Sequence, residues 1–152
     1  MNGPRLRRLI ADHQQVMSAL AQHPRIKLLQ TEGAPPEKYT VEFQVAGLVN
    51  DQSQVGHVHR AEIFLNLDYP RRPPFCRMIT PVFHPNIDPQ KICIGDHWSA
   101  GESVVDLIIR IAQMIAYQSY NVKSPLNAGA AMWAEQHEAQ LPLEKIDLTA
   151  TA

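Results

Sequence analysis

The sequence predicts an α+β fold: an N-terminal helix, a four-stranded antiparallel meander, an ordered proline-rich segment, a central buried helix and a C-terminal helix. Apolar residues recur with a helical period at residues 4–23 and again at residues 104–117. Between residues 26 and 80 that period disappears, and β-branched and aromatic residues alternate in part with polar ones. Short turns between the strand-like runs favour antiparallel pairing. Helices packed on an antiparallel sheet are the expected architecture.

The first helix is predicted over Pro4–His23. Proline suits a first helical turn, and Pro24 ends the helix because it cannot continue the backbone hydrogen bonding. The apolar stripe consists of Leu6, Leu9, Ile10, Val16 and Leu20. The other face is polar and carries three arginines near its start, Arg5, Arg7 and Arg8.

Four strands are predicted next, over Arg25–Thr31, Lys38–Leu48, His57–Leu67 and Phe75–Thr80. His57 and His59 alternate onto one face of the third strand, which raises the question of a metal site. No third ligand is placed by the sequence, so the two histidines are interpreted as residues on the exposed side of a strand and no metal is predicted.

Six prolines then fall within twenty residues, which excludes both a helix and a central strand. They are Pro70, Pro73, Pro74, Pro81, Pro85 and Pro89. The apolar residues among them are too many for a flexible linker, so an ordered, irregular segment is expected. Rigid segments of this kind are where functional sites tend to be built.

Ser103 is the predicted N-cap of a helix over Val104–Tyr117, the central packing element. Its polar residues, Asp106, Arg110 and Gln113, lie on one narrow stripe, and nearly everything else is apolar. Asn127 is expected to cap a last helix that ends near residue 141, before Pro142. The chain is therefore predicted to form one domain, residues 1–141, followed by a C-terminal tail, residues 142–152, with weak structural signals.

Composition limits the functional classes. The formal charge is −1 and the sequence pI is near 6.6, so no global basic field indicates nucleic acid or an anionic membrane as a partner. No apolar run is long enough for a bilayer span, and no signal-peptide pattern opens the chain. The two cysteines, Cys76 and Cys93, are too few for a disulfide framework or a cysteine-based zinc site. A cytoplasmic protein with free thiols is expected.

Five short elements resemble the catalytic core of the ubiquitin-conjugating enzyme family, in the family's order. They are Tyr-Pro with Pro-Pro in Asp68–Pro74, His-Pro-Asn in Thr80–Ile87, the acceptor-cysteine stretch Ile92–Ile94, Trp98-Ser99, and Ser124–Asn127. The resemblance covers about sixty residues closely and the whole domain loosely, and it implies the ubiquitin-conjugating fold. It also implies an enzyme that carries a ubiquitin-like protein as a thioester and passes it to an amine.

The resemblance assigns roles to individual residues. Cys93 is the thioester carrier, and Cys76, at the start of an apolar strand, is interpreted as a small buried hydrophobe. Asn86 supplies an amide to the developing oxyanion or holds the loop beside it. His84 fixes the loop backbone so that Asn86 points correctly. Ser124 stands where the family often has an acidic residue and would orient the incoming amine.

Asp96 and His97, three and four residues after Cys93, are candidates for helping the amine to lose its proton. Either residue is equally well explained as a solvated loop residue. From Asn86 to Cys93 is seven positions and from Cys93 to Trp98 is five, which is shorter than the family pattern on both sides.

The resemblance also implies partners: a ubiquitin-like modifier, an ATP-dependent activating enzyme and lysines of a protein substrate. Arg5, Arg7 and Arg8 are expected to meet the activating enzyme; reversing all three charges should slow loading and leave thermal stability nearly unchanged. Arg71 and Ala100 replace residues that members offer to RING-type ligases, so use of a ligase stays open. No bound cofactor is implied, because the activating enzyme uses the ATP.

Together the departures indicate a divergent member, and bacterial relatives encoded with antiviral operons fit that description. Two other functions are compatible with part of this pattern. A non-catalytic conjugating-enzyme variant or an RWD-type interaction domain would share the fold, but would lack an acceptor cysteine after His84-Pro85-Asn86. A cysteine hydrolase would need a histidine bonded to Cys93, either His97 or His84, and the fold pattern does not suit it.

Overall fold

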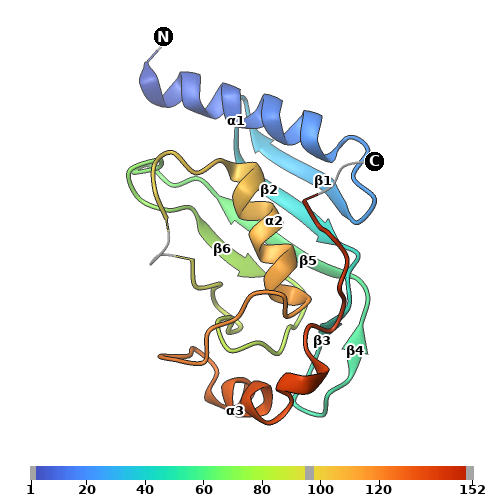
Figure 1. The fold of residues 1–152 in the computed structure, drawn as a ribbon. Coiled ribbons are helices and arrows are strands. Elements are labelled where there is room, and N and C mark those ends of the chain that lie inside the picture. The colour runs from blue at the N-terminus through green and yellow to red at the C-terminus, as the bar shows by residue number, and fades with distance from the viewer. Residues whose placement is uncertain (1–2, 95–97, 150–152) are drawn as a thin grey trace.

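A computed structural model describes residues 3–94 and 98–149. Its sheet has the order β1 (Ile26–Gly33), β2 (Pro36–Phe43), β5 (His59–Phe64) and β6 (Phe75–Met78), with every neighbouring pair antiparallel (Figure 1). The four-stranded meander predicted from the sequence is therefore confirmed. The second predicted strand, Lys38–Leu48, ends early, because the chain leaves the sheet after β2 and pairs β3 (Gly47–Leu48) with β4 (Val55–Gly56) in a separate ribbon.

Helix α1 runs from Pro4 to Leu20 and ends three residues before the predicted boundary. The reason is the side chain of His23, which is buried and turns the chain into β1. Its Nδ1 accepts hydrogen bonds from the backbone N–H groups of Arg25, at 3.0 Å, and Ile26, at 3.1 Å. These two bonds satisfy the amides at the start of the strand.

Both α1 and α2 (Val104–Ile115) lie on one face of the sheet, and α2 crosses its middle (Figure 1). Alternate strand residues point into the core that these helices cover, among them Tyr39, Val41, Ile63 and Met78. The central position predicted for α2 is confirmed by its seven buried residues. Its predicted cap is present as a capping box, in which Ser103 Oγ accepts from the Asp106 N–H at 3.0 Å.

The proline-rich segment is ordered, as expected. Tyr69 is buried and donates its hydroxyl to Asp12 Oδ2 at 2.6 Å, which ties the segment to α1. The indole Nε1 of Trp98 donates to the Pro70 carbonyl at 3.0 Å, and the Trp98 and Tyr69 rings lie 5.8 Å apart. These contacts explain how a segment without regular hydrogen bonding keeps one conformation.

Helix α3 spans Ala128–Gln136, and the side chain of its predicted cap, Asn127, accepts from the Ala130 N–H at 3.0 Å. The helix is shorter than predicted, because His137 leaves the helical region with φ −125° and ψ 23°. A single 3₁₀ turn, η2 (Glu138–Gln140), follows.

Residues 142–149, here called the C-terminal strap, run back along the molecule towards the end of α1 (Figure 1). The Leu143 N–H donates to the Ala116 carbonyl at 2.9 Å, and Glu144 Oε1 accepts from the Ala46 N–H at 2.9 Å. At the far end, Leu148 is buried and its carbonyl accepts from His23 Nε2 at 2.8 Å. The sequence predicted weak structure here; the structure instead packs the strap on the domain.

Within the described residues, no helix combines the length and apolar character needed to cross a membrane.

Candidate functional site

The two cysteines have opposite environments. Cys76 lies on β6 with its side chain in the core, 1% exposed, as the sequence predicted. Burial raises the pKa of the Cys76 thiol well above its ordinary value, so the thiolate is disfavoured. Cys93 is exposed and unpaired. Only Cys93 therefore presents its sulfur to other molecules.

The exposure of Cys93 follows from a strand-like alternation between two buried isoleucines. Ile92 donates its N–H to the Cys76 carbonyl at 2.8 Å, which continues the sheet beyond β6 by one bond. Ile92 and Ile94 point inward, at 4% and 6% exposed, so the residue between them points outward. The Cys93 N–H donates to the Asn86 carbonyl at 2.9 Å, which joins the cysteine to the His-Pro-Asn loop.

His84 is the buried anchor of that loop, and both of its ring nitrogens are used. Its Nδ1 accepts from the Asn86 N–H at 3.0 Å, so Nε2 carries the hydrogen and donates to the Ser119 carbonyl at 3.0 Å. The ring packs on Tyr117 with centroids 4.8 Å apart. Burial lowers the pKa of His84 to about 4, so the ring is neutral at pH 7 and directs the backbone on both sides of it.

The side chain of Asn86 bridges two loops. Its Nδ2 donates to the Asn121 carbonyl at 2.9 Å, and its Oδ1 accepts from the Asn121 N–H at 2.8 Å. This reciprocal pair holds residues 119–124 beside the cysteine. A carboxamide nitrogen has two hydrogens, and the bond to Asn121 uses one of them.

A cavity of about 330 Å³ joins these parts. Cys93, Asn86 and Ser124, which the sequence predicted to lie in one site, all line it. Ser124 takes a left-handed backbone conformation with φ 52°, which bends the segment around the mouth of the cavity. Asp96 and His97, the other two predicted residues, lie outside the described residues.

The family model of ubiquitin-conjugating enzymes matches residues 14–144 of this chain, a span from within α1 to the strap. The chain belongs to the ubiquitin-conjugating enzyme family. The site above is the part of this family member in which the Ile92–Ile94 stretch with Cys93, the His-Pro-Asn motif and the Ser124–Asn127 junction meet.

Known relatives agree with that assignment. Ubiquitin-conjugating enzyme E2 N of Drosophila melanogaster is 35% identical over 89 residues, which cover 55% of this chain and 58% of that protein. A solved structure described as a novel ubiquitin-conjugating enzyme superposes with a TM-score of 0.67 at 24% identity, over 90% of this chain and 89% of that one. A structure from Plasmodium yoelii, described as that of a ubiquitin-conjugating enzyme, superposes with a TM-score of 0.65 at 18% identity. The superposition covers 91% of this chain and 88% of that one. The structural likenesses establish the ubiquitin-conjugating fold.

Two cations at the site of this conjugating-family chain were not predicted to be functional. Arg110, on α2, and Lys123, in the 119–124 segment, both line the cavity with Cys93. The sequence placed Arg110 on a polar stripe of a buried helix and left Lys123 in a connection. The available signal was a cation on the narrow polar stripe of a largely apolar helix, because a partly buried cation needs a partner.

The arginines of α1 do not behave alike. Arg5 donates to the Tyr69 carbonyl at 2.9 Å and pairs with Glu37 at 2.8 Å. Arg8 pairs with the buried Asp12 at 3.1 Å and donates to the carbonyls of Ala100 and Glu102, at 2.6 and 2.7 Å. Because the side chains of Arg5 and Arg8 hold parts of the fold together, we expect reversal of all three charges to lower thermal stability, whereas the sequence alone predicted nearly no change. Arg7 is the exposed member of the three.

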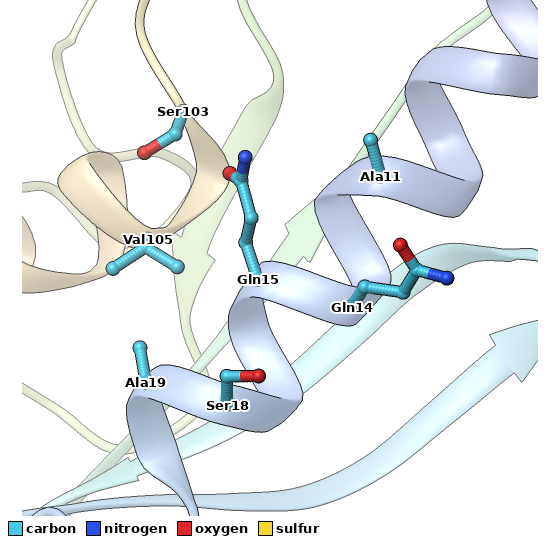
Figure 2. Close-up of a pocket in the computed structure, with 7 residues that line it drawn as sticks. All are labelled: Ala11, Gln14, Gln15, Ser18, Ala19, Ser103 and Val105. Carbon is cyan, nitrogen blue, oxygen red and sulfur yellow. The ribbon is translucent and has the colours of Figure 1, made fainter.

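A larger hollow of about 590 Å³ lies between α1 and the beginning of α2 (Figure 2). Figure 2 shows Gln15 pointing from α1 towards Ser103, with Ala11, Ser18 and Val105 around them. Its lining residues are small, amide or hydroxyl side chains without a titratable group. Chemistry at a thiol therefore belongs to the smaller cavity.

Only one of the two strand histidines has the exposure that the sequence predicted. His59 is buried, and its Nε2 lies 3.1 Å from the Val45 carbonyl and 3.0 Å from the Gly56 carbonyl; His57 is exposed. The interpretation of both as exposed is wrong for His59, because the chain folds β3 and β4 over it. Within the described part of the chain, no group of three or more metal-binding side chains is present.

Proposed function

We propose that this family member accepts a ubiquitin-like protein as a thioester on Cys93 and transfers it to an amine of a target protein. The observation that carries the proposal is the exposed, unpaired Cys93 in a cavity shared with Asn86. A structural cysteine of this family would sit in the core, as Cys76 does.

Loading requires an exchange of one thioester for another. The Cys93 thiolate attacks the carbonyl carbon of the modifier's last residue, a C–S bond to Cys93 forms, and the activating enzyme's sulfur leaves as a thiolate. The carbonyl oxygen carries negative charge during the attack, and the remaining donor of Asn86 is the group assigned to it. A donor of this kind is worth roughly 3–4 kcal/mol in acyl transfer.

Transfer then replaces sulfur by nitrogen. The amine of the target attacks the same carbonyl, a C–N bond forms, the Cys93 thiolate leaves, and the amine gives up a proton. Ser124 is assigned to orient the amine through its hydroxyl, because serine is a poor base. Asp96 and His97 remain candidates for taking the proton.

The other candidate is a non-catalytic protein-interaction module on the same fold. The fold alone supports it equally, but an exposed thiol beside the loop of His84 and Asn86 favours the enzyme.

The test is a loading assay with the candidate modifier, its activating enzyme and ATP, followed by non-reducing gels. Wild type should give an adduct that thiols remove, Cys93→Ala none, and Cys93→Ser a thiol-resistant adduct. Cys76→Ala is the matched control and should load normally. No adduct from a demonstrably active activating enzyme would favour the interaction module.

The activating enzyme is assigned to the beginning of α1, where Arg7 is exposed. Arg7→Glu should slow loading several-fold through lost charge complementarity. Lys27→Glu, an exposed charge reversal on β1, is the matched control and should load at the wild-type rate. If both variants load at the same rate, α1 does not contact the activating enzyme through Arg7. A reducing compartment such as the cytoplasm suits an exposed free thiol of this kind.

A further inference from the structure

We propose that the cavity beside Cys93 selects a modifier whose C-terminal tail carries an acidic side chain close to its last residue. The inference rests on the proposed function, because the tail reaches this cavity through its thioester bond to Cys93. The charged side chains around the Cys93 sulfur are the basis for the class of modifier.

Two positively charged side chains line the cavity. Arg110 comes from α2 and Lys123 from the 119–124 segment, and the other lining residues that the structure describes are uncharged. Lys123 is exposed, and no ion pair to it is present within residues 3–94 and 98–149. A cavity with one sign of charge attracts the opposite sign and repels its own.

Arg110 contributes less to this charge than Lys123, because it is already paired with a carboxylate. One end of its guanidinium pairs with Glu102, with Nη2 and Oε2 3.1 Å apart. Its Nε is buried and has no hydrogen-bond partner among the described residues. Because Glu102 balances the charge of Arg110, Lys123 is the cation that gives the cavity its net positive charge and that a ligand carboxylate can meet.

The tail of the modifier is the ligand that meets these groups for the longest time. Its last residue is covalently bound to Cys93, and each preceding residue of an extended chain adds only about 3.3–3.6 Å. The second or third residue from the end therefore lies at cavity distance. The acceptor amine is a poorer match, because it arrives as a cation and is repelled until it loses its proton.

The experiment uses short peptide thioesters, which load a thiol without the activating enzyme. Three acetylated peptides end in Leu-Xaa-Gly-Gly as a benzyl thioester, with Xaa as Glu, Gln or Arg. The Cys93 thiolate attacks the carbonyl and benzyl thiolate leaves with the electron pair. Intact-mass spectrometry measures the rate of adduct formation on the full chain at low salt, and Cys93→Ala gives the background.

The Glu peptide should form the adduct fastest, the Gln peptide more slowly and the Arg peptide slowest. Each step should be about fivefold, because one charge pair near 4 Å in water is worth about 1 kcal/mol. Raising the salt to 0.5 M should compress the differences, because exposed charges are screened. Lys123→Glu should reverse the order of the Glu and Arg peptides. Arg110→Lys keeps a positive charge beside Glu102 and should leave the order of the three rates unchanged.

Lys91→Glu is the matched control, because Lys91 is exposed and close to Cys93 in sequence but does not line the cavity. It should keep the wild-type order. Equal rates for the three peptides, or the same reversal in Lys91→Glu as in Lys123→Glu, would overturn the charge selection and leave the thioester function standing. No adduct on Cys93 from any peptide would instead overturn the proposed function.

Discussion

Acidification from pH 6.5 to pH 4 should destabilise this fold through His84, whose ring is buried and fully hydrogen-bonded. Burial lowers its pKa from 6.5 to about 4 in the folded chain. Between these values the unfolded chain binds a proton at this residue and the folded chain does not. Stability therefore rises with pH through this window, is complete above pH 6.5, and is lost as the pH falls towards 4.

The size of the effect follows from the gap between the two pKa values. One pKa unit corresponds to about 1.4 kcal/mol, so the contribution of His84 to the free energy of unfolding is about 3 kcal/mol at pH 7. That is a large part of the 5–15 kcal/mol typical of a single domain.

The assay is urea unfolding of wild type and His84→Gln at half-unit steps from pH 7.5 to 4. Glutamine does not titrate, so the difference between the two proteins isolates His84 from the other groups that titrate in the window, including His59. At pH 7.5 the variant should be less stable by about 1–3 kcal/mol, because the Asn86 N–H loses its acceptor. The wild-type advantage should then shrink steadily towards pH 4. If the free energy of unfolding changes with pH in the same way for both proteins, His84 is not held neutral by burial.

Three further outcomes are expected. In the native protein a thiol reagent should label Cys93 alone, and Cys76 should react only after unfolding; fast labelling of two thiols would contradict the burial of Cys76. Arg8→Glu should lower the free energy of unfolding by about 3–5 kcal/mol in urea titrations, because it leaves the buried carboxylate of Asp12 unpaired; a wild-type value would mean that the carboxylate is not held by this pair. Leu148→Ala should cost about 2–5 kcal/mol, and a loss below 1 kcal/mol would show that the strap is not packed.

Much of this architecture was predictable because it follows from local rules. The caps at Ser103 and Asn127 were identified from side chains that accept backbone N–H groups at helix starts. The antiparallel sheet follows from successive strands that pair in chain order, and α2 was recognised as central from its apolar circumference.

Other features depend on partners distant in sequence. His59 is buried only because β3 and β4 fold over it, and the strap is held by Ala46, Ala116 and His23. No local pattern near Leu148 records those contacts. At the site, the motifs identified Cys93 and its loop, but the cations could not be placed there, because a cavity wall is a property of the fold.

Because Ile92 and Ile94 point inward and Cys93 between them points outward, the exposure of the sulfur depends on whether an insertion before it has an odd or an even number of residues. The turn before Cys93 is fixed by Asp88, whose side chain accepts from the N–H groups of Gln90 and Lys91. One residue inserted directly before Cys93 would rotate the thiol into the core, whereas two would return it to the surface.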